Sequence, residues 1–435
     1  MPPPDARAAV SPEPSAPART PLPALVVFSH LRWGAMVRRP QHLLSRLARE
    51  FRVFFIEEPV FGEGTPVLLA TCPQAGLEVL TPRTPVAAPG FHDAQQLALE
   101  ALLAQFAAER HIDEPVAWLT TPMALPLAAD FEPRAVVYDC GEDFADAPDA
   151  PRQLLQREEA LLDLADIVLT ASPALHAVRR ARYSNLHCLP SAVDAAHFAR
   201  PAANRLECAA ARALHEGLPR PRLGFFGMID ERVDLELVAA IADSRPGWQL
   251  VMVGPVAPGV ADALPRRPNI RWLGEQSYDM LPHLQSHWDV CLLPLRQDAT
   301  TLHAAPAQTL EYLAGGKPVV AVPLADVVAL HGAVVRLAPD APAFVAAIEA
   351  ALAETPAQRE QRRLQAQAVV DASSWDESAA VILELLREFV RPASMRALSL
   401  EIAPEARGLA LPPLPAAAAR RGGSGATPTA FAPGH

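Results

Sequence analysis

The stretch from Thr301 to Pro323 reads TLHAAPAQTLEYLAGGKPVVAVP, and it decides the fold prediction for this chain. Pro306 suits the first turn of a helix, where its missing N–H removes no hydrogen bond. Leucines and alanines follow at helical spacing until Gly315 and Gly316 end the helix. The apolar run from Val319 to Val322 is typical of a central parallel strand. The stretch therefore predicts a loop, a short helix, a tight turn and a buried strand.

Glu311 lies about one turn into this predicted helix. A carboxylate there suits the positive end of the helix dipole. The same position could hold a sugar hydroxyl beside phosphates bound at the helix end. The alternative is a plain helix–turn–strand unit, which any α/β enzyme contains.

The bulk composition narrows the class of protein. The chain has 435 residues, enough for two domains, and half of them are hydrophobic. Its 46 prolines exceed ordinary usage. Many lie in residues 1–22 and 392–435, which lack periodicity and are predicted to be disordered tails. A net charge of −11 without an arginine cluster argues against a nucleic-acid binder.

The cysteines and the apolar segments indicate a cytosolic protein. The five cysteines are scattered, without C-x-x-C spacing, which predicts buried free thiols and argues against a zinc site or a disulfide framework. The N-terminus lacks the pattern of a secretory signal, and no apolar run reaches transmembrane length. Peripheral contact with a membrane is left open.

Apolar runs alternate with helical segments in two series. The first series occupies residues 23–190, a junction covers 191–221, and the second series covers 222–370. A last amphipathic helix is predicted for 371–391. Only irregular strands are expected between residues 65 and 89, where prolines interrupt short apolar runs.

Several polar residues of the first series follow predicted strands. In an open parallel sheet, ligands bind at the carboxyl ends of the strands. His30 and Arg32 follow the first strand, Arg39 and His42 open the next helix, and Asp139 ends a later strand. We therefore expect these side chains at the mouth of a cleft.

Structural alternatives exist for most of these polar residues. His30 could bond to backbone at the strand end, while Arg39 and His42 could cap their helix. Glu142 and Asp143, which follow Asp139, could cap the next helix.

Glycines end the strands of the second series. Gly227 ends its first strand, and a glycine there lets the backbone approach a phosphate closely. Arg232, in the loop that follows, could reach the same charge. Gly254 and Gly274 end the next two strands.

Three segments carry a resemblance to a known family. PAQTLEYLAGGKPVV from Pro306, PSAVDAAHF from Pro190, and the opening FSHLRW with RPQHLL resemble nucleotide-sugar glycosyltransferases of the GT-B fold, close to glycosyltransferase family 4. The resemblance covers roughly residues 25 to 390. It implies an α/β chain of two Rossmann-like domains facing across a cleft. The first (23–190) would bind the acceptor, the second (222–370) the donor, and the last helix would cross back.

The resemblance also implies roles for single residues. Glu311 would hold the ribose, the helix start and Arg232 the diphosphate, and the strand end at Gly274 would border the base. The residues implied in donor binding are Gly227, Arg232, Gly254, Gly274, Pro306, Ala307, Gln308, Thr309 and Glu311, with His303 beside the donor sugar. Those implied on the acceptor side are His30 and Asp139, as catalytic groups, with Arg32, Arg39 and His42. No metal and no organic cofactor are expected, and the co-substrate would be a UDP- or GDP-sugar.

Two departures from the family pattern fall on the donor side. Many family 4 enzymes have a second glutamate eight positions before the first, where this chain has His303. The related bacterial group usually has Ser-Pro-Thr-Lys where this chain has Ala305-Pro-Ala-Gln308. Losing a capping hydroxyl costs about 1 kcal/mol, and losing a lysine–phosphate bond costs roughly 1.5–3 kcal/mol.

With this resemblance, the expected protein is a bacterial cytoplasmic hexosyltransferase, and the family implies a retaining, metal-independent reaction. It would transfer sugar to a glycan or lipid-linked acceptor for envelope or exopolysaccharide assembly. Two alternatives stay open: a GT-B nucleotide-sugar-binding or scaffold protein without turnover, and a sugar-nucleotide epimerase on the same architecture.

Overall fold

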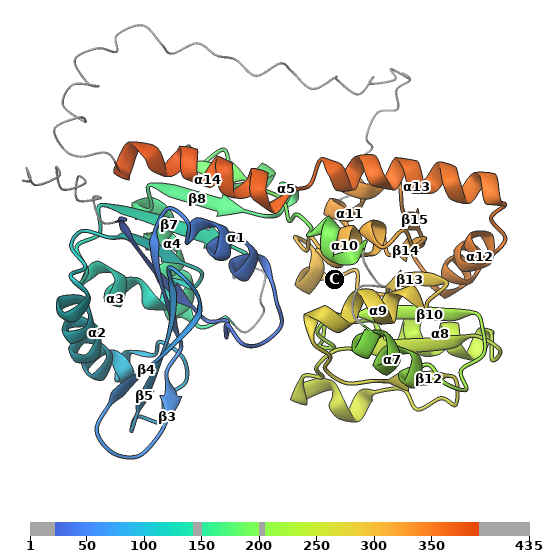
Figure 1. Ribbon diagram of the computed structural model, residues 1–435, viewed down its shortest axis with the longest axis horizontal. Coiled ribbons are helices and arrows are strands. Elements are labelled where there is room, and N and C mark those ends of the chain that lie inside the picture. The colour runs from blue at the N-terminus through green and yellow to red at the C-terminus, as the bar shows by residue number, and fades with distance from the viewer. Residues whose placement is uncertain (1–21, 142–149, 200–204, 391–435) are drawn as a thin grey trace, which may run out of the picture. The chain divides into compact units, whose positions relative to one another are not determined.

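The computed structural model describes residues 22–141, 150–199 and 205–390 (Figure 1). Residues 1–21 and 391–435, which make up nearly all of the two predicted tails, lie outside these ranges, as do Glu142 and Asp143.

The first half of the described chain contains one nine-stranded sheet with the order β3-β5-β2-β1-β6-β7-β8-β9, to which β4 adds by pairing with β5. All of its pairs are parallel except β4–β5. The strands are β1 (Ala24–Ser29), β2 (Arg52–Glu57), β3 (Val60–Phe61), β4 (Val67–Gln74), β5 (Leu77–Thr84), β6 (Val116–Leu119), β7 (Ala135–Cys140), β8 (Ile167–Thr170) and β9 (Leu186–Cys188).

Helices cover both faces of this sheet, so its inner strands are apolar on both sides. Along β1, Val26 and Phe28 belong to one core cluster, whereas Leu25 and Val27 belong to another. The helices of this half are α1 (Arg39–Leu47), α2 (Gln96–Arg110), α3 (Leu125–Ala129), α4 (Arg152–Leu164) and α5 (Pro173–Arg179), with 3₁₀ turns η1 (Asp93–Gln95) and η2 (Pro122–Ala124). Two further helices, α6 (Ala195–Phe198) and α7 (Arg205–Leu214), follow β9 and contribute Phe198 and Ala211 to the core of the second half.

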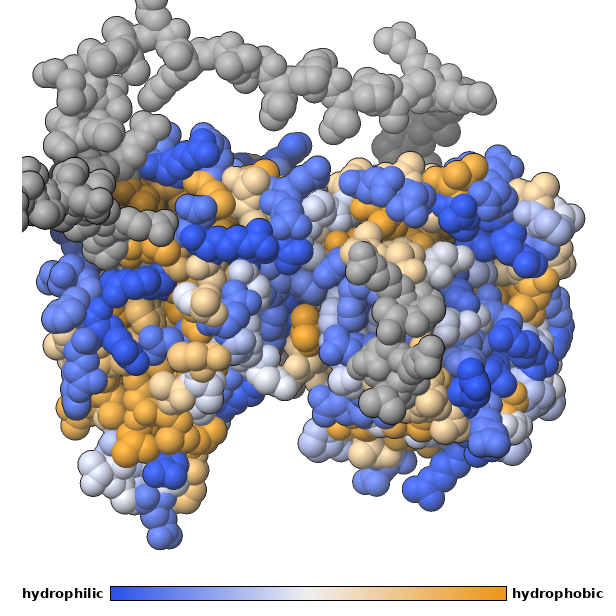
Figure 2. Space-filling model, viewed as in Figure 1, coloured by the Kyte–Doolittle hydropathy of each residue, from blue (hydrophilic) through white to orange (hydrophobic). Residues whose placement is uncertain are grey.

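Strands occupy the region between residues 65 and 89, as predicted, and their pairing is irregular at one point. β4 and β5 form an antiparallel pair of eight residues each, with a register shift between Thr71 and Gln74. Gly76, at a φ of +80°, makes the turn between them, and the register shift accommodates the proline in β4. Figure 2 shows hydrophobic side chains at the surface in this part of the molecule, where Phe61 and Leu69 are well exposed.

The second half contains a parallel sheet with the order β12-β11-β10-β13-β14-β15, counting the described residues. Its strands are β10 (Arg222–Phe226), β11 (Gln249–Val253), β12 (Ile270–Trp272), β13 (Val290–Leu293), β14 (Val319–Ala321) and β15 (Arg336–Leu337). β14, predicted to be a central strand, pairs with β13 on one side and β15 on the other.

The helices of this half are α8 (Leu235–Ser244), α9 (Leu281–Ser286), α10 (Gln308–Ala314), α11 (Ala325–His331), α12 (Ala341–Leu352) and α13 (Pro356–Asp371), with 3₁₀ turns η4 (Pro258–Ala263), η5 (Tyr278–Met280) and η6 (Ala299–Thr301). α10 is the helix predicted in the stretch from Thr301 to Pro323, but it begins at Gln308. Pro306 lies before the helix in a tight turn, and the Pro306 carbonyl accepts a hydrogen bond from the Thr309 amide at 3.2 Å.

The last helix, α14 (Trp375–Val390), packs on the first half of the chain and lies along α1 in Figure 1. Trp375, Ile382 and Leu386 share a core cluster with the leucines of α1. Arg46 of α1 also forms an ion pair with Asp376 at 3.0 Å. In the part of the chain that the structure describes, no helix has the length and apolar character needed to cross a bilayer.

Candidate functional site

Three glycines lie side by side at the carboxyl ends of β10, β11 and β12, and we call Gly227, Gly254 and Gly274 the glycine shelf. The Gly227 amide donates to the Val253 carbonyl at 3.0 Å, and the Gly254 amide donates to the Gly274 carbonyl at 2.8 Å. All three have positive φ, at 148°, 141° and 69°. A Cβ on Gly254 would lie 1.8 Å from the Gly227 carbonyl oxygen. The shelf is therefore bare backbone, as close approach of a ligand requires.

Two side chains of helix α10 hold the helix against the glycine shelf. A Cβ on Gly227 would lie 2.7 Å from Nε2 of Gln308, so the Gln308 amide group rests against the shelf. One turn later, the buried Tyr312 hydroxyl accepts from the Phe226 amide at 2.9 Å. Gln308 and Tyr312 thus fix the helix directly beside the end of β10.

The start of α10 provides fewer backbone donors than the sequence predicts. The Thr309 amide is already used by the Pro306 carbonyl, and the Thr309 side chain is fully buried with no partner for Oγ1 among the described residues. The amides of Ala307 and Gln308 have no acceptor in the described ranges. The N-cap, Ala307, has no side-chain cap. We therefore drop Thr309 from the predicted diphosphate donors.

Glu311 is the most unusual ionisable group near the shelf. No hydrogen bond or ion pair joins its carboxylate to another described residue, and burial raises its pKa to about 8. An unpaired carboxylate in such surroundings costs free energy. Strongly raised carboxyl pKa values of this kind concentrate at functional sites.

Tyr278 is a residue of this site that the sequence analysis did not single out. Its pKa is raised, first by burial and then by the nearby charge of Glu311. Its hydroxyl is buried and has no partner within the described ranges. The available signal was an aromatic residue four positions after Gly274, the glycine that ends a predicted strand.

Arg232 lies in the loop after β10 and is oriented by Asp230, which sequence reasoning missed. The two side chains form an ion pair with an Nη2–Oδ2 distance of 2.6 Å, and the Arg232 amide also donates to Asp230. The Arg232 side chain stays partly exposed. His303 lies between η6 and α10 and is partly buried.

On the first half, Asp139 and Arg39 form a buried ion pair. Both oxygens of Asp139 accept from Nε of Arg39, at 3.1 and 3.3 Å, and Arg39 also donates to the Leu189 carbonyl at 2.7 Å. Burial raises the pKa of Asp139 more than Arg39 lowers it. The pair joins the start of α1 to the end of β7, which makes Asp139 an anchor for Arg39 in this structure.

This arrangement predicts a loss of stability on changing Asp139. Asp139→Asn should destabilise the protein by about 3 kcal/mol, because Arg39 keeps its buried charge without a counter-ion. Urea unfolding of Asp139→Asn, Arg39→Met and the double variant measures the coupling between them. Additive effects of the two single changes would contradict a direct pair.

The other predicted acceptor residues are separate from this pair. His30 is exposed, with Nδ1 3.3 Å from the Thr120 hydroxyl at the end of β6, the strand between β1 and β7. Arg32 pairs with Glu57 at 3.1 Å and donates to the Glu58 carbonyl, so it anchors its own loop.

One alternative expected Arg39 and His42 to cap α1, but neither side chain does so. Gln41 does so instead, accepting from the Arg38 amide at 3.0 Å. The His42 ring stacks on Trp375 of α14 at 4.9 Å and meets Tyr278 edge-on at 5.6 Å. Burial lowers its pKa to about 4, which keeps the ring neutral.

The cysteines differ in part from the prediction of buried thiols. All five cysteines lie in the described ranges and none forms a disulfide, but only Cys140 and Cys291 are buried, whereas Cys72 is exposed on the edge strand β4. In the described ranges no cluster of three or more His, Cys, Asp or Glu side chains could hold a metal ion.

Comparison with known proteins connects this geometry to a family. Residues 220–354 match the family model Glycosyl transferases group 1. The putative teichuronic acid biosynthesis glycosyltransferase TuaH of Bacillus subtilis is 28% identical over 220 residues. That alignment covers 47% of this chain and 54% of TuaH, so the chain spans about half the length of this relative.

Solved structures give the fold of the whole described chain. Sucrose-phosphate synthase from Thermosynechococcus elongatus superposes with a TM-score of 0.66 at 18% identity, covering 84% of this chain and 98% of that one. HepE from Anabaena, in complex with UDP and glucose, gives 0.62 at 15% identity over 84% and 99% of the two chains. An E. coli trehalose-6-phosphate protein bound with UDP-2-fluoro glucose gives the same TM-score, identity and coverage. These are GT-B glycosyltransferases, and the predicted GT-B fold is confirmed.

Proposed function

We propose that this chain is a glycosyltransferase that moves a sugar from a nucleotide-diphosphate donor to a glycan or lipid-linked acceptor in bacterial envelope or exopolysaccharide assembly. The observation that carries the proposal is Glu311, an unpartnered carboxylate with a raised pKa beside a bare glycine shelf. The match of residues 220–354 to Glycosyl transferases group 1 and the likeness to TuaH support it.

Glu311 would bind the ribose of the donor. A carboxylate accepts hydrogen bonds from two vicinal hydroxyls, and such bonds favour its charged form. The ribose would thus supply the partner that Glu311 lacks among the described side chains. A UDP-sugar is our first choice of donor, supported by the UDP and UDP-sugar complexes of HepE and the E. coli protein.

The leaving diphosphate would be held by fixed donors of the second half. Arg232, oriented by Asp230, would supply positive charge, and the amides of Ala307 and Gln308 would supply hydrogen bonds. We propose transfer with retention and without a required metal. In this arrangement the enzyme's main task is to stabilise the departing charge.

The acceptor would approach from the first half, where His30 is the exposed side chain at the end of β1. We propose His30 as the residue that contacts the acceptor hydroxyl, with Asp139 acting through Arg39. A lipid-linked acceptor would bring the protein to the membrane surface.

A thermal-shift screen of UDP-, GDP- and TDP-sugars, followed by a turnover assay with acceptor, tests the proposal. We expect one donor class to raise the melting temperature of the wild type and to leave Glu311→Ala unchanged. Donor binding without transfer or hydrolysis would instead support the scaffold alternative, and conversion of donor without acceptor would support the epimerase. Equal turnover by wild type and Glu311→Ala would refute the assignment of Glu311.

A further inference from the structure

The carboxyl end of α10 is held by a buried side chain of α9. Gln285 is almost fully buried, and its Nε2 donates to the carbonyls of Glu311, at 3.3 Å, and Tyr312, at 3.0 Å. A Cβ on Gly315 would lie 2.4 Å from the same Nε2. Because Gly315 has no Cβ, there is space for the Gln285 side chain, which bonds directly to the backbone of Glu311.

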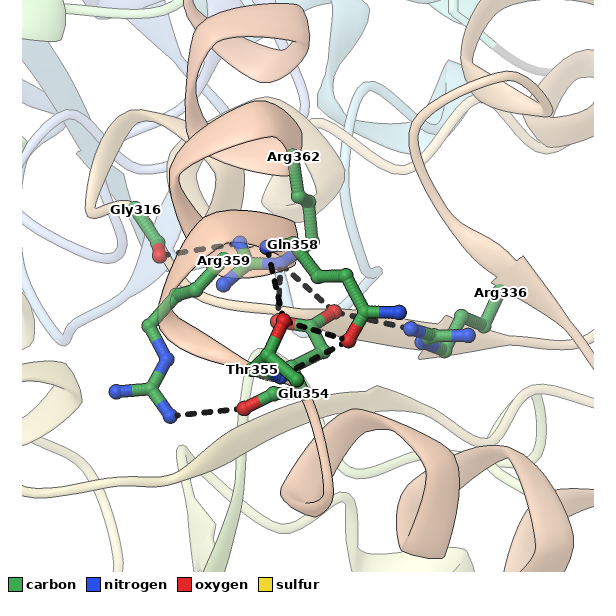
Figure 3. Close-up of polar contacts among 7 residues, drawn as sticks. All are labelled: Gly316, Arg336, Glu354, Thr355, Gln358, Arg359 and Arg362. Atoms are coloured by element: carbon green, nitrogen blue, oxygen red, sulfur yellow. Dashed lines mark hydrogen bonds and ion pairs between the residues drawn. The ribbon is translucent and has the colours of Figure 1, made fainter.

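A second contact reaches the same end of the helix from α13. Nη1 of Arg362 donates to the Gly316 carbonyl at 3.2 Å, and its Nε donates to both oxygens of Glu354 at 3.1 Å. Glu354 also accepts from Arg336 at 2.9 Å (Figure 3). The carboxylate is nearly inaccessible to solvent, so both charge-assisted bonds are shielded from screening.

These contacts matter because α10 is short. The last carbonyls of a helix have no partner inside it, and a seven-residue helix is marginal without tertiary contacts. At this end of α10, the amides of Gly315, Gly316 and Lys317 bond to the carbonyls of Glu311, Leu313 and Tyr312, and Gln285 and Arg362 add side-chain partners. At the other end the described residues provide no side-chain cap.

We propose that Gln285 and Arg362 are positioning residues that hold the carboxyl end of α10 and so fix the Glu311 carboxylate relative to the glycine shelf. The proposal rests on the proposed function, because it gives these two residues a part in donor binding. Gln308 and Tyr312 keep α10 beside the shelf, so loss of either contact lets the helix tilt about that attachment, and the Glu311 carboxylate shifts relative to the shelf.

Arg336 offers a matched control within the same ion-pair network. It shares the Glu354 carboxylate with Arg362, but its hydrogen bond goes to Glu354 and not to α10. Arg336→Met and Arg362→Met each remove one arginine from one buried carboxylate. Only Arg362→Met also removes a partner of the Gly316 carbonyl.

The test measures hydrogen exchange and donor binding in four variants at a temperature where all are folded. The amides of residues 308–317 should exchange about tenfold faster than in the wild type in both Arg362→Met and Gln285→Leu. In Arg336→Met they should exchange at wild-type rates, and in Arg362→Lys at rates close to those of the wild type. The Kd for UDP-glucose should rise about tenfold in the first two, with less than about twofold change in Arg336→Met.

The two readouts separate the proposals. If the wild type binds no nucleotide sugar, the proposed function fails, and hydrogen exchange still tests whether Gln285 and Arg362 hold α10. If the wild type binds donor but Arg336→Met weakens binding and speeds exchange as much as Arg362→Met, the network is merely structural and the positioning role is overturned. Unchanged exchange in both Arg362→Met and Gln285→Leu overturns it as well.

Discussion

Glu311→Gln is expected to make the free protein more stable while strongly weakening donor binding. The free protein holds an unpartnered carboxylate whose pKa is raised to about 8, and glutamine removes that cost without changing the shape of the side chain. Donor affinity should fall by about 100-fold, because a neutral amide replaces an acceptor of two charge-assisted bonds. Thermal unfolding and calorimetric titration with UDP-glucose measure the two effects.

The gain in stability should depend on pH in a defined direction. The folded pKa of Glu311, about 8, lies above its ordinary value of 4.5, so the folded state holds a proton that the unfolded chain releases. Wild-type stability therefore falls as pH rises from 4.5 to 8, and this part of the decline is absent in Glu311→Gln. At pH 8 we expect a difference of about 2 kcal/mol, since partial exposure reduces the full value of about 1.4 kcal/mol per pKa unit.

Donor binding should show the opposite dependence on pH. Ribose hydroxyls donate to the ionised carboxylate, so binding expels a proton and tightens as pH rises from 6 towards 8.5. Glu236→Gln, which changes an exposed carboxylate on α8, is the control and should alter neither property. A Glu311→Gln variant that melts below the wild type at pH 8, or that binds donor normally, would contradict this account.

Gly254→Ala is expected to destabilise the protein by about 3 kcal/mol or more and to destroy donor binding. The added Cβ would lie 1.8 Å from the Gly227 carbonyl oxygen and 2.8 Å from the Gly227 carbonyl carbon, both of which are backbone atoms. A side-chain rotation cannot relieve this contact, so the ends of β10 and β11 must separate. The φ of 141° adds strain for any residue with a Cβ.

Gly259→Ala provides the matched control for this change. Gly259 lies in η4 of the same half, and nothing stands within 4 Å of a Cβ built on it. Urea unfolding compares the two variants at one pH. A cost below about 1 kcal/mol for Gly254→Ala would show that the shelf can open, and its backbone would not be the rigid support assigned here.

The stretch from Thr301 to Pro323 shows how much of the structure local sequence information can predict. It predicted α10, the turn and β14, because the leucine spacing, the glycine pair and the valine run each act within a few residues of the chain. It placed the start of α10 two residues early, because Pro306 suits a tight turn as well as a first helical turn. The glycine shelf was also visible, since each of its glycines follows its own apolar strand.

The local patterns missed one element, α13, and gave only the presence of strands, without their pairing, for another, the β4–β5 pair. α13 is a polar helix of sixteen residues in which Ala366 and Val370 are buried, so its apolar periodicity is faint. The β4–β5 pair contains prolines, which argue against strands. Its register comes from pairing with β2 and from the turn at Gly76.

By itself the sequence determined the two β/α series, the glycines at the strand ends and the helix that carries Glu311, because backbone propensity and apolar periodicity are properties of neighbouring residues. Only the tertiary structure decided which side chains of distant elements contact one another. It joined Asp139 to Arg39 across 100 positions, brought Tyr278 near Glu311, and set Gln285 and Arg362 against the end of α10. Such contacts arise when separate elements pack on one another, and the energy that selects them comes from burial and charge pairing between distant parts of the chain, which no local pattern records.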